Sequence, residues 1–291
     1  MQNKLFLKFF NFSILKRLYN ERLGEPFIYL LISFFVFLFG NLRQKIKYDL
    51  VPREAYAYGI LAAADLAKIN NVKKIILIEF GVAAGGGLLN MCYIAKEVTK
   101  LTGIEFQIFG FDTGKGMPEP LNYKDHPEKY FTGDYPLVDR AALLKKLPTN
   151  ATIIFGKIED SVNDFLKNVK FPIGFVSIDV DYYYSTVDCL KVFNSFPELY
   201  LPYVFTYFDD VYNIDHNIFC GELLAIKEFN DVNTLRKISI ATMLNNSRIF
   251  RRSPWTHQTY LTHIFDHESR SIQYIEAHNV GITILANPYL S

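Results

Sequence analysis

Cysteine is scarce in this chain of 291 residues. Its three cysteines, Cys92, Cys189 and Cys220, lie far apart, and their number is odd. That spacing excludes a disulfide framework and offers none of the paired cysteines of a zinc site. The pattern fits a reducing compartment, so we expect a cytoplasmic protein.

An excess of charge of either sign is also missing. Lysine and arginine number 31 against 30 aspartates and glutamates, and no basic stripe interleaved with aromatic residues runs along the chain. The sequence therefore does not predict a nucleic-acid binder. Glycine (16) and proline (12) are at ordinary levels and half of the residues are hydrophobic, which excludes a disordered chain. A chain of this length forms one large α/β domain with additions, or two domains.

The first 47 residues differ from the rest, and we treat them as a helical lead. They hold eight lysines and arginines against two glutamates, and residues 26–42 carry no charge. As a helix this uncharged run is about 25 Å long, short of the ~30 Å hydrocarbon core of a bilayer. Apolar and basic residues upstream recur at near-helical spacing, as in helices that lie on anionic membranes. Two interpretations stay open: a membrane-associated segment, or a hydrophobic helix packed on the body or on a second subunit.

Strand and helix patterns alternate in residues 48–291, which we assign to one domain. This alternation predicts βαβ units and a mostly parallel sheet with helices on both faces, an α/β fold. Two C-terminal segments, 258–265 and 281–286, are typical of strands and would add an antiparallel edge. The other expected strands are 73–80, 106–112, 151–155, 173–179 and 203–208, and the expected helices are 52–70, 88–101, 140–147, 158–169, 186–193 and 221–229.

Acidic side chains stand where the expected strands end. Ligands of open α/β sheets bind beyond the carboxyl ends of the strands, so these residues share the edge of the sheet where a ligand would lie. Folding does not need them there, and their mutual repulsion costs stability unless a cation or a ligand offsets it. They are Glu79, Asp112, Asp179, Asp181, Asp209 and Asp210.

A glycine-rich segment, Glu79–Gly87, follows the first strand and opens a helix. Glycines at such a turn let the backbone approach a ligand and direct amides toward it. The segment is not a dinucleotide fingerprint, because Asn90 stands where the last glycine belongs, and no Gly-Lys-Ser/Thr of a Walker loop follows. An acidic residue two positions before the first glycine, with a further glycine four positions later, is typical of a sulfonium-nucleotide site. The alternative is an ordinary tight turn between a strand and a helix.

Asp112 ends the second expected strand. A carboxylate at that position can accept both hydroxyls of a ribose, as acidic residues do in nucleotide-binding sheets. The alternative is an aspartate that caps the Thr113–Gly114 turn. Together with the glycine turn, Asp112 favours a nucleotide-like cofactor.

Four short motifs follow one another over residues 75–230. They are Glu79–Gly87, the segment Gly110–Pro120 with Phe-Asp-Thr at its start, Ile178–Thr186 with the sequence Ile-Asp-Val-Asp-Tyr-Tyr-Tyr-Ser-Thr, and Phe208–Asp210. The ordered set resembles the class I S-adenosylmethionine-dependent methyltransferases, and within them the macrocin O-methyltransferase-like group. That group shows Phe-Asp-Thr-x-x-Gly-Leu-Pro-Glu, Ile-Asp-x-Asp-x-Tyr-x-Ser-Thr and Asp-Asp in the last three places. Val180 replaces the usual glycine and Gly114-Lys115 the commoner Phe-Glu, both on the acceptor side.

The resemblance implies a Rossmann-like methyltransferase fold and transfer of a methyl group from S-adenosylmethionine to a hydroxyl of a sugar or another small acceptor. A divalent cation helps to deprotonate a hydroxyl, and Mg²⁺ prefers carboxylate ligands. Asp179 or Asp181 would be the catalytic general base; this choice, and Mg²⁺ against Mn²⁺, stays open. The implied cofactor-binding residues are Glu79, Gly81, Gly85, Gly87, Asp112, Gly156 and Asp160, and the implied metal ligands are Asp179, Asp181, Asp209 and Asp210.

Two other functions stay open from the sequence. Asp179-Val180-Asp181 is also a D-x-D motif, of the kind that holds a metal and a nucleotide-sugar diphosphate in glycosyltransferases, although Glu79–Gly87 and Asp112 would then lack a role. A non-catalytic, membrane-associated protein would account for residues 1–47 and would leave the acidic strand ends without a purpose. The sequence does not determine whether the chain forms a homo-oligomer.

Overall fold

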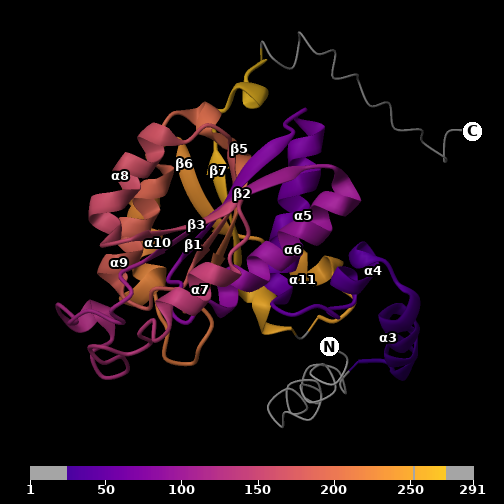
Figure 1. Cartoon of the computed structure of the whole chain (residues 1–291), viewed down its shortest axis with the longest axis horizontal. Coiled ribbons are helices and arrows are strands. Elements are labelled where there is room, and N and C mark those ends of the chain that lie inside the picture. Colours follow the sequence, from indigo (N-terminus) through magenta and orange to yellow (C-terminus); the bar gives the residue numbers. More distant parts are fainter. Residues whose placement is uncertain (1–24, 252, 273–291) are drawn as a thin grey trace, which may run out of the picture.

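One mixed β-sheet with helices on both faces organises the chain (Figure 1). The computed structural model describes residues 25–251 and 253–272. In this part of the chain, seven strands pair in the order β3-β2-β1-β4-β5-β7-β6. The pairs from β3 to β5 are parallel, and β7 runs antiparallel to β5 and β6. The strands are β1 Lys74–Phe80, β2 Glu105–Asp112, β3 Ala151–Phe155, β4 Ile173–Ile178, β5 Tyr200–Phe208, β6 Arg236–Ile240 and β7 Thr259–Ile264.

Helices α5 and α6 cover one face of the sheet, and α8, α9 and α10 cover the other (Figure 1). The short helix α4 packs against α5 and α6, and α3 packs against α4. The helices are α3 Phe27–Phe39, α4 Leu42–Lys47, α5 Glu54–Ile69, α6 Gly86–Thr102, α7 Arg140–Lys146, α8 Ile158–Asn168, α9 Tyr183–Leu190, α10 Gly221–Val232 and α11 Thr242–Ser247. Short 3₁₀ helices span Tyr123–Asp125, Lys191–Phe193, Pro197–Leu199, Pro254–His257 and Glu268–Arg270.

The central strands are apolar along nearly their whole length because both of their faces are covered. Every residue of β4 is buried, and in β1 only the first residue, Lys74, is not. Parallel strands between two helical layers take this near-continuous hydrophobic form. The exception is Glu79, the second-last residue of β1, which is buried with the apolar residues around it.

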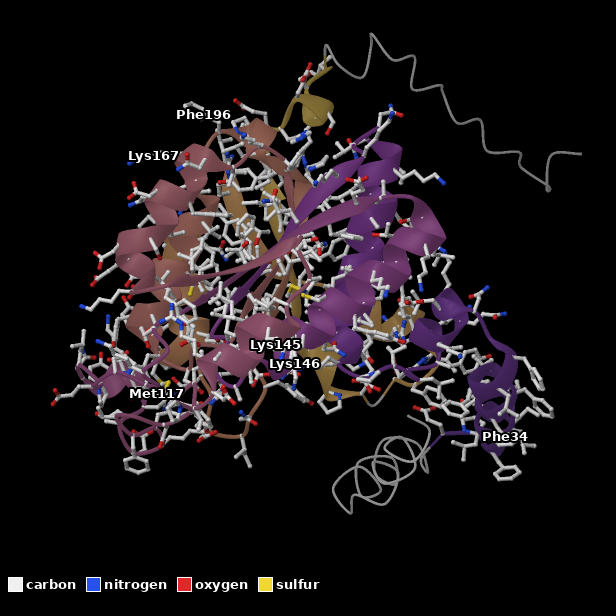
Figure 2. All side chains as sticks on the ribbon, in the orientation of Figure 1. Phe34, Met117, Lys145, Lys146, Lys167 and Phe196 are labelled. Atoms are coloured by element: carbon white, nitrogen blue, oxygen red, sulfur yellow. The ribbon has the colours of Figure 1, made fainter. Side chains whose placement is uncertain are left out.

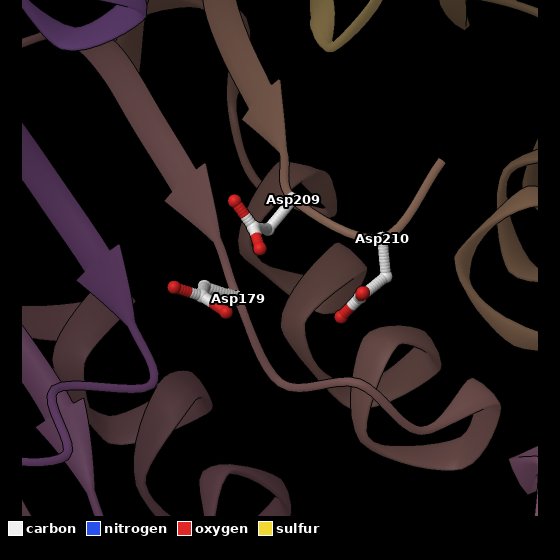
Figure 3. Close-up of side chains that lie close together, drawn as sticks. All are labelled: Asp179, Asp209 and Asp210. Atoms are coloured by element: carbon white, nitrogen blue, oxygen red, sulfur yellow. The ribbon is translucent and has the colours of Figure 1, made fainter. Parts of the chain in front are cut away.

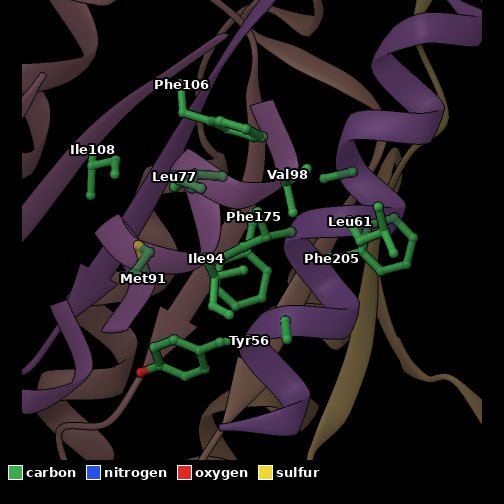
Figure 4. Packing of buried hydrophobic residues seen from close by; sticks show 14 of the residues in the cluster. Tyr56, Leu61, Leu77, Met91, Ile94, Val98, Phe106, Ile108, Phe175 and Phe205 are labelled. Carbon is green, nitrogen blue, oxygen red and sulfur yellow. The ribbon is translucent and has the colours of Figure 1, made fainter. Parts of the chain in front are cut away.

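The core between the sheet and helices α5 and α6 leads directly to the edge of the sheet where the acidic residues gather (Figure 4). The ring of Tyr56 from α5 packs edge-on against Phe175 of β4, with ring centroids 5.5 Å apart. The hydroxyl of Tyr56 donates a hydrogen bond to Glu79 Oε1 at 2.8 Å and lies 2.6 Å from the hydroxyl oxygen of Ser177. The hydrophobic core therefore fixes a polar group beneath the functional edge of the sheet.

The predicted alternation of strands and helices is confirmed, as is an antiparallel edge that includes the predicted strand near residues 258–265. Strand β6, Arg236–Ile240, was not predicted from the sequence; it forms the outer strand of that edge. The segment 281–286, expected as a strand, lies outside the described residues. Within the uncharged run, α3 has 13 residues, and no helix of the described part is long and apolar enough to cross a membrane.

Replacing Gly59 with alanine should destabilise the protein. A Cβ at this buried position of α5 would lie 2.5 Å from Cε2 of Phe175. Overpacking of this kind costs about 1–3 kcal/mol, which exceeds or matches the gain of about 1 kcal/mol from better helix propensity. Urea denaturation should show a lower free energy of unfolding. Gly86→Ala is the matched control, because nothing lies within 4 Å of its Cβ, and it should be neutral or stabilising. Equal stability of the two variants would contradict this account.

Candidate functional site

A cavity of about 870 Å³ opens at the carboxyl ends of the parallel strands. Loops after β1, β2, β3, β4 and β5 form its wall, as expected for an α/β sheet. The structure brings seven of the predicted site residues together in this wall. They are Gly81, Asp112, Gly156, Asp179, Asp181, Asp209 and Asp210.

The glycine turn after β1 has a backbone that side chains would disrupt. Gly81 has φ 86°, and a Cβ there would lie 1.8 Å from the carbonyl oxygen of Asp179. Gly85 has φ 82° and precedes α6; a Cβ would meet the side chain of Leu143 at 2.3 Å. The Gly87 backbone covers the Glu79 carboxylate, since a Cβ at 87 would lie 1.9 Å from Glu79 Oε1. Gly81 lines the cavity. Gly85 and Gly87 belong to the turn but do not line the cavity.

The carboxylate of Asp112 fastens this turn to the end of β2. Its Oδ2 accepts hydrogen bonds from the amides of Val82 at 2.8 Å and Ala83 at 2.7 Å, and its Oδ1 accepts from the amide of Gly114 at 2.6 Å. The capping role that the sequence offered as an alternative is therefore present. A carboxylate offers about four acceptor positions, so one remains for a ligand hydroxyl on the cavity side.

Glu79 lies beneath the turn and not in the cavity wall. Its Oε1 accepts from Tyr56, and its Oε2 is buried with no hydrogen-bond partner among the described residues. Burial raises the pKa of Glu79 to about 7, and the Tyr56 hydrogen bond and the positive charge of Arg53 only partly offset that rise. The structure places the residue where it supports the glycine turn from below.

Three aspartates from two neighbouring strands converge in the cavity. Asp179 follows β4, and Asp209 and Asp210 follow β5 (Figure 3). One carboxylate oxygen from each lies within 4.8 Å of the others. Asp209 accepts a hydrogen bond from Tyr207, and Asp210 Oδ1 accepts one from Tyr130 at 2.9 Å.

This group has the size and the chemistry of a divalent-cation site. Two oxygens on opposite sides of a Mg²⁺ ion lie about 4.2 Å apart, since each bond is about 2.1 Å. Asp210 Oδ2 is buried and has no partner among the described residues. Burial, with repulsion from neighbouring carboxylates, raises the pKa of Asp179 well above its usual value and also raises that of Asp209. The residues present therefore fit a cation that would offset their repulsion.

Asp181 stands outside this three-aspartate group. Its backbone is left-handed, with φ 60°, and its side chain lies in the cavity wall. Burial, together with the charge and hydrogen bonding of Asp210, raises the pKa of Asp181 to about 8. Of the four predicted metal ligands, the structure therefore groups three and sets the fourth beside them.

Two tyrosines and a glutamate complete the acidic site. Glu222, in the first turn of α10, is fully buried; its Oε2 accepts from the Asp210 amide at 2.9 Å, and its Oε1 has no partner in the described chain. Tyr130 and Tyr207 were not singled out from the sequence. Tyr207 lies in β5, two residues before Asp209, so the two-residue repeat of a strand could have indicated that both side chains share a face. Tyr130 lies in a long loop, where no such repeat exists.

Asp160 lies away from the acidic site. It lines a second hollow of about 660 Å³ formed by β3 and α8, which shares Gly156 and Lys157 with the main cavity. Its side chain is exposed in the first turn of α8. Contact between Asp160 and a cofactor therefore requires that the cofactor extend past Gly156 into this second hollow.

Ionisation of Glu79 should lower stability as the pH rises. Its pKa is about 7 in the folded protein and about 4.3 in an unfolded chain. A raised folded-state pKa gives stability that is complete below the unfolded value and is lost as the pH rises through the folded value. The loss is at most about 4 kcal/mol. Glu79→Gln keeps an oxygen for Tyr56 but does not titrate. Urea denaturation from about pH 5 to pH 8 should show a shallower decline for this variant; identical declines would refute the assignment.

No protein-family model and no curated protein matches this sequence. Solved methyltransferase structures match it in fold. The calicheamicin methyltransferase CalS11 is 20% identical over 59% of this chain and 70% of its own, with a TM-score of 0.44. The O-methyltransferase NovP is 16% identical over 63% and 75%, with a TM-score of 0.44. An O-methyltransferase from Bacillus cereus is 10% identical over 86% and 96%, with a TM-score of 0.39.

Identities and TM-scores of this size carry no argument about activity, so the chemistry of the site has to come from this chain's own residues. The fold itself follows from the strand order, in which five parallel strands are followed by an antiparallel pair at one edge. Helices cover both faces, and the candidate site lies at the carboxyl ends of the parallel strands. The chain has a Rossmann-like α/β fold, with a mostly parallel sheet and an antiparallel edge.

Proposed function

We propose that this protein is an S-adenosylmethionine-dependent O-methyltransferase that methylates a hydroxyl of a sugar or another small acceptor with the help of a divalent cation. The observation that carries the proposal is the meeting of two half-sites in one cavity. One is the glycine turn fastened by Asp112, and the other is the group formed by Asp179, Asp209 and Asp210.

The glycine turn and Asp112 suit the nucleoside part of the cofactor. A cavity of about 870 Å³ lies within the usual range for small-molecule and cofactor sites. Gly81 and Gly156 bring bare backbone to its wall, and the remaining acceptor position of Asp112 can bind a ribose hydroxyl. S-adenosylmethionine, when bound, supplies a methyl group on a positively charged sulfur. The neighbouring carboxylates favour a cation in this cavity by simple electrostatics.

The three-aspartate group would hold the divalent cation, which lowers the pKa of a hydroxyl that it binds. Tyr130 and Tyr207 donate hydrogen bonds to Asp210 and Asp209 and so orient the two carboxylates. Glu222 holds the backbone amide of Asp210. These contacts fix the ligand oxygens before any ion arrives, which reduces the ordering needed on binding.

Asp181 is the residue that we assign as the general base. The acceptor's proton has to leave as its oxygen forms the new bond to the methyl carbon and the carbon–sulfur bond breaks. Asp181 lines the cavity beside the three-aspartate group and is not part of it. A carboxylate in this position can accept the proton of a hydroxyl that the cation has made more acidic.

Calorimetric titration of S-adenosylmethionine into the full chain should show saturable binding in the micromolar range. Asp112→Ala should abolish it, because the variant removes the ribose acceptor and loosens the turn that Asp112 fastens. Asp231→Ala, an exposed aspartate of α10, is the matched control and should bind normally. Circular dichroism should confirm that all three proteins are folded.

The same titration separates the proposal from the glycosyltransferase alternative. Folded wild-type protein that ignores S-adenosylmethionine and instead binds uridine-diphosphate glucose with Mn²⁺ would refute the methyltransferase assignment. The methyltransferase is favoured because Asp179 groups with Asp209 and Asp210 of the neighbouring strand end, and Asp181, the second aspartate of the D-x-D motif, is not part of that group.

Mg²⁺ should raise the melting temperature of the wild-type protein, because an ion that binds only the folded state stabilises it. Asp209→Asn should melt at a higher temperature than wild type without Mg²⁺, since one repelling charge is gone, and should lose most of the Mg²⁺ response. Asparagine still accepts the hydrogen bond from Tyr207. Asp231→Asn should respond to Mg²⁺ as wild type does. A full Mg²⁺ response in Asp209→Asn would place the ion elsewhere.

A further inference from the structure

Helix α3 leaves most of its apolar side chains exposed. Its 13 residues include no charged side chain. Phe34 and Phe35 are each 60% exposed, whereas Ser33, the only serine of the helix, is buried. Helices on a globular body place their apolar side chains against the core, and α3 does not. The exposed large side chains are Phe27, Ile28, Tyr29, Leu31, Phe34, Phe35, Phe37, Leu38 and Phe39.

Seven of these nine side chains, all except Tyr29 and Phe37, lie within about 140° of arc on an α-helix. We call these seven side chains the Phe34 stripe. Exposure of such a stripe to water is unfavourable, and burial in an apolar medium would relieve it. At 13 residues the helix is about 20 Å long, too short to span a bilayer but long enough to lie in its interface.

Basic side chains surround the stripe. Lys45 and Lys47 follow in α4, where Arg43 is paired with Asp65, and α3 to α4 contain no acidic residue. Lys145 and Lys146 end α7 and are exposed. In Figure 2 these two lysines lie between Phe34 of α3 and Met117 of the cavity wall, all at one end of the molecule. Phe196 and Lys167 lie at the opposite end.

The body of the protein holds α3 in this orientation through α4. The side chain of Asn41 caps α4 and Gln44 caps it in return. Buried Arg248 donates to the backbone oxygens of Ile46 and Lys47 and to the carboxylate of Asp49. A buried ion pair of this kind is costly to break, so the helix that follows α3 is fixed to the core.

We propose that α3 docks this protein on an anionic lipid surface, with the Phe34 stripe in the bilayer interface and the lysines of α4 and α7 against the headgroups. Apolar area supplies the insertion and positive charge supplies the preference for anionic lipid. The end of the molecule that carries the cavity then faces the membrane. Other occupants of the stripe are residues 1–24 of this chain or a second copy, and each gives a different result below.

Flotation of the full chain with vesicles tests the proposal. The protein should float with vesicles of equal parts phosphatidylcholine and phosphatidylglycerol, float far less with phosphatidylcholine alone, and release as salt rises. The double variant Phe34→Glu, Phe35→Glu should bind at least about tenfold less. Phe196→Glu is the matched control: this side chain is 72% exposed at the opposite end and should not matter.

A second pair of variants tests which end faces the lipid. Lys145→Glu with Lys146→Glu should weaken binding to the anionic vesicles by about tenfold or more. Lys167→Glu, an exposed lysine at the opposite end, should bind as wild type does. Equal binding by the Lys145 and Lys146 variant would overturn the proposed orientation.

Three results would overturn the docking itself. One is unchanged flotation of the Phe34 and Phe35 variant. Another is a wild-type dimer that does not float and that the same variant converts to a monomer, which would assign the stripe to a second copy. The third is a monomer that does not float, which would indicate that residues 1–24 of the same chain cover the stripe. Because flotation requires no cofactor, calorimetry with S-adenosylmethionine on the same preparations separates this proposal from the proposed function.

Discussion

Repulsion between carboxylates is the constraint on which this site depends. Asp179, Asp181, Asp209 and Asp210 meet at the carboxyl ends of two adjacent strands, and buried Glu222 lies behind them. Only a rigid sheet can hold such charges together, because each strand end is fixed by the pairing of its neighbours. The same constraint explains the tyrosines, whose hydroxyls solvate carboxylates that water reaches poorly. A bound cation would offset this repulsion.

Much of the architecture could be predicted from the sequence because its signals are local. Buried runs such as 75–78 and 173–176 are apolar throughout, which is the pattern of covered parallel strands. Residues that end those runs had to share one edge, so the convergence of Asp179 with Asp209 and Asp210 followed from topology alone. Strand β6 lacked such a signal, since only Arg236 and Ile238 of its five residues are buried and two of the five are Arg236 and Lys237.

Other features of the site depend on three-dimensional contacts that no local pattern encodes. Asp112 was predicted from its place at the end of a strand, but its three amide partners come from two separate turns. Tyr130 reaches Asp210 from a position 80 residues earlier in the chain. The apolar character of α3 was plain from the sequence, whereas the direction of its stripe depends on how α4 is fastened to the body.

The backbone contact between Gly81 and Asp179 ties the two half-sites together. A Cβ at 81 would lie 1.8 Å from the Asp179 carbonyl, so the turn after β1 and the end of β4 touch with no side chain between them. The amide of Asp179 also donates to the carbonyl of Phe80 at 3.0 Å. The separation between the glycine turn and the three-aspartate group is therefore a property of the main chain. Several residues of the loop 113–139 line the cavity. Under the proposed function, substitutions in this loop would change the choice of acceptor without moving the methyl donor, so specificity and donor geometry would evolve independently.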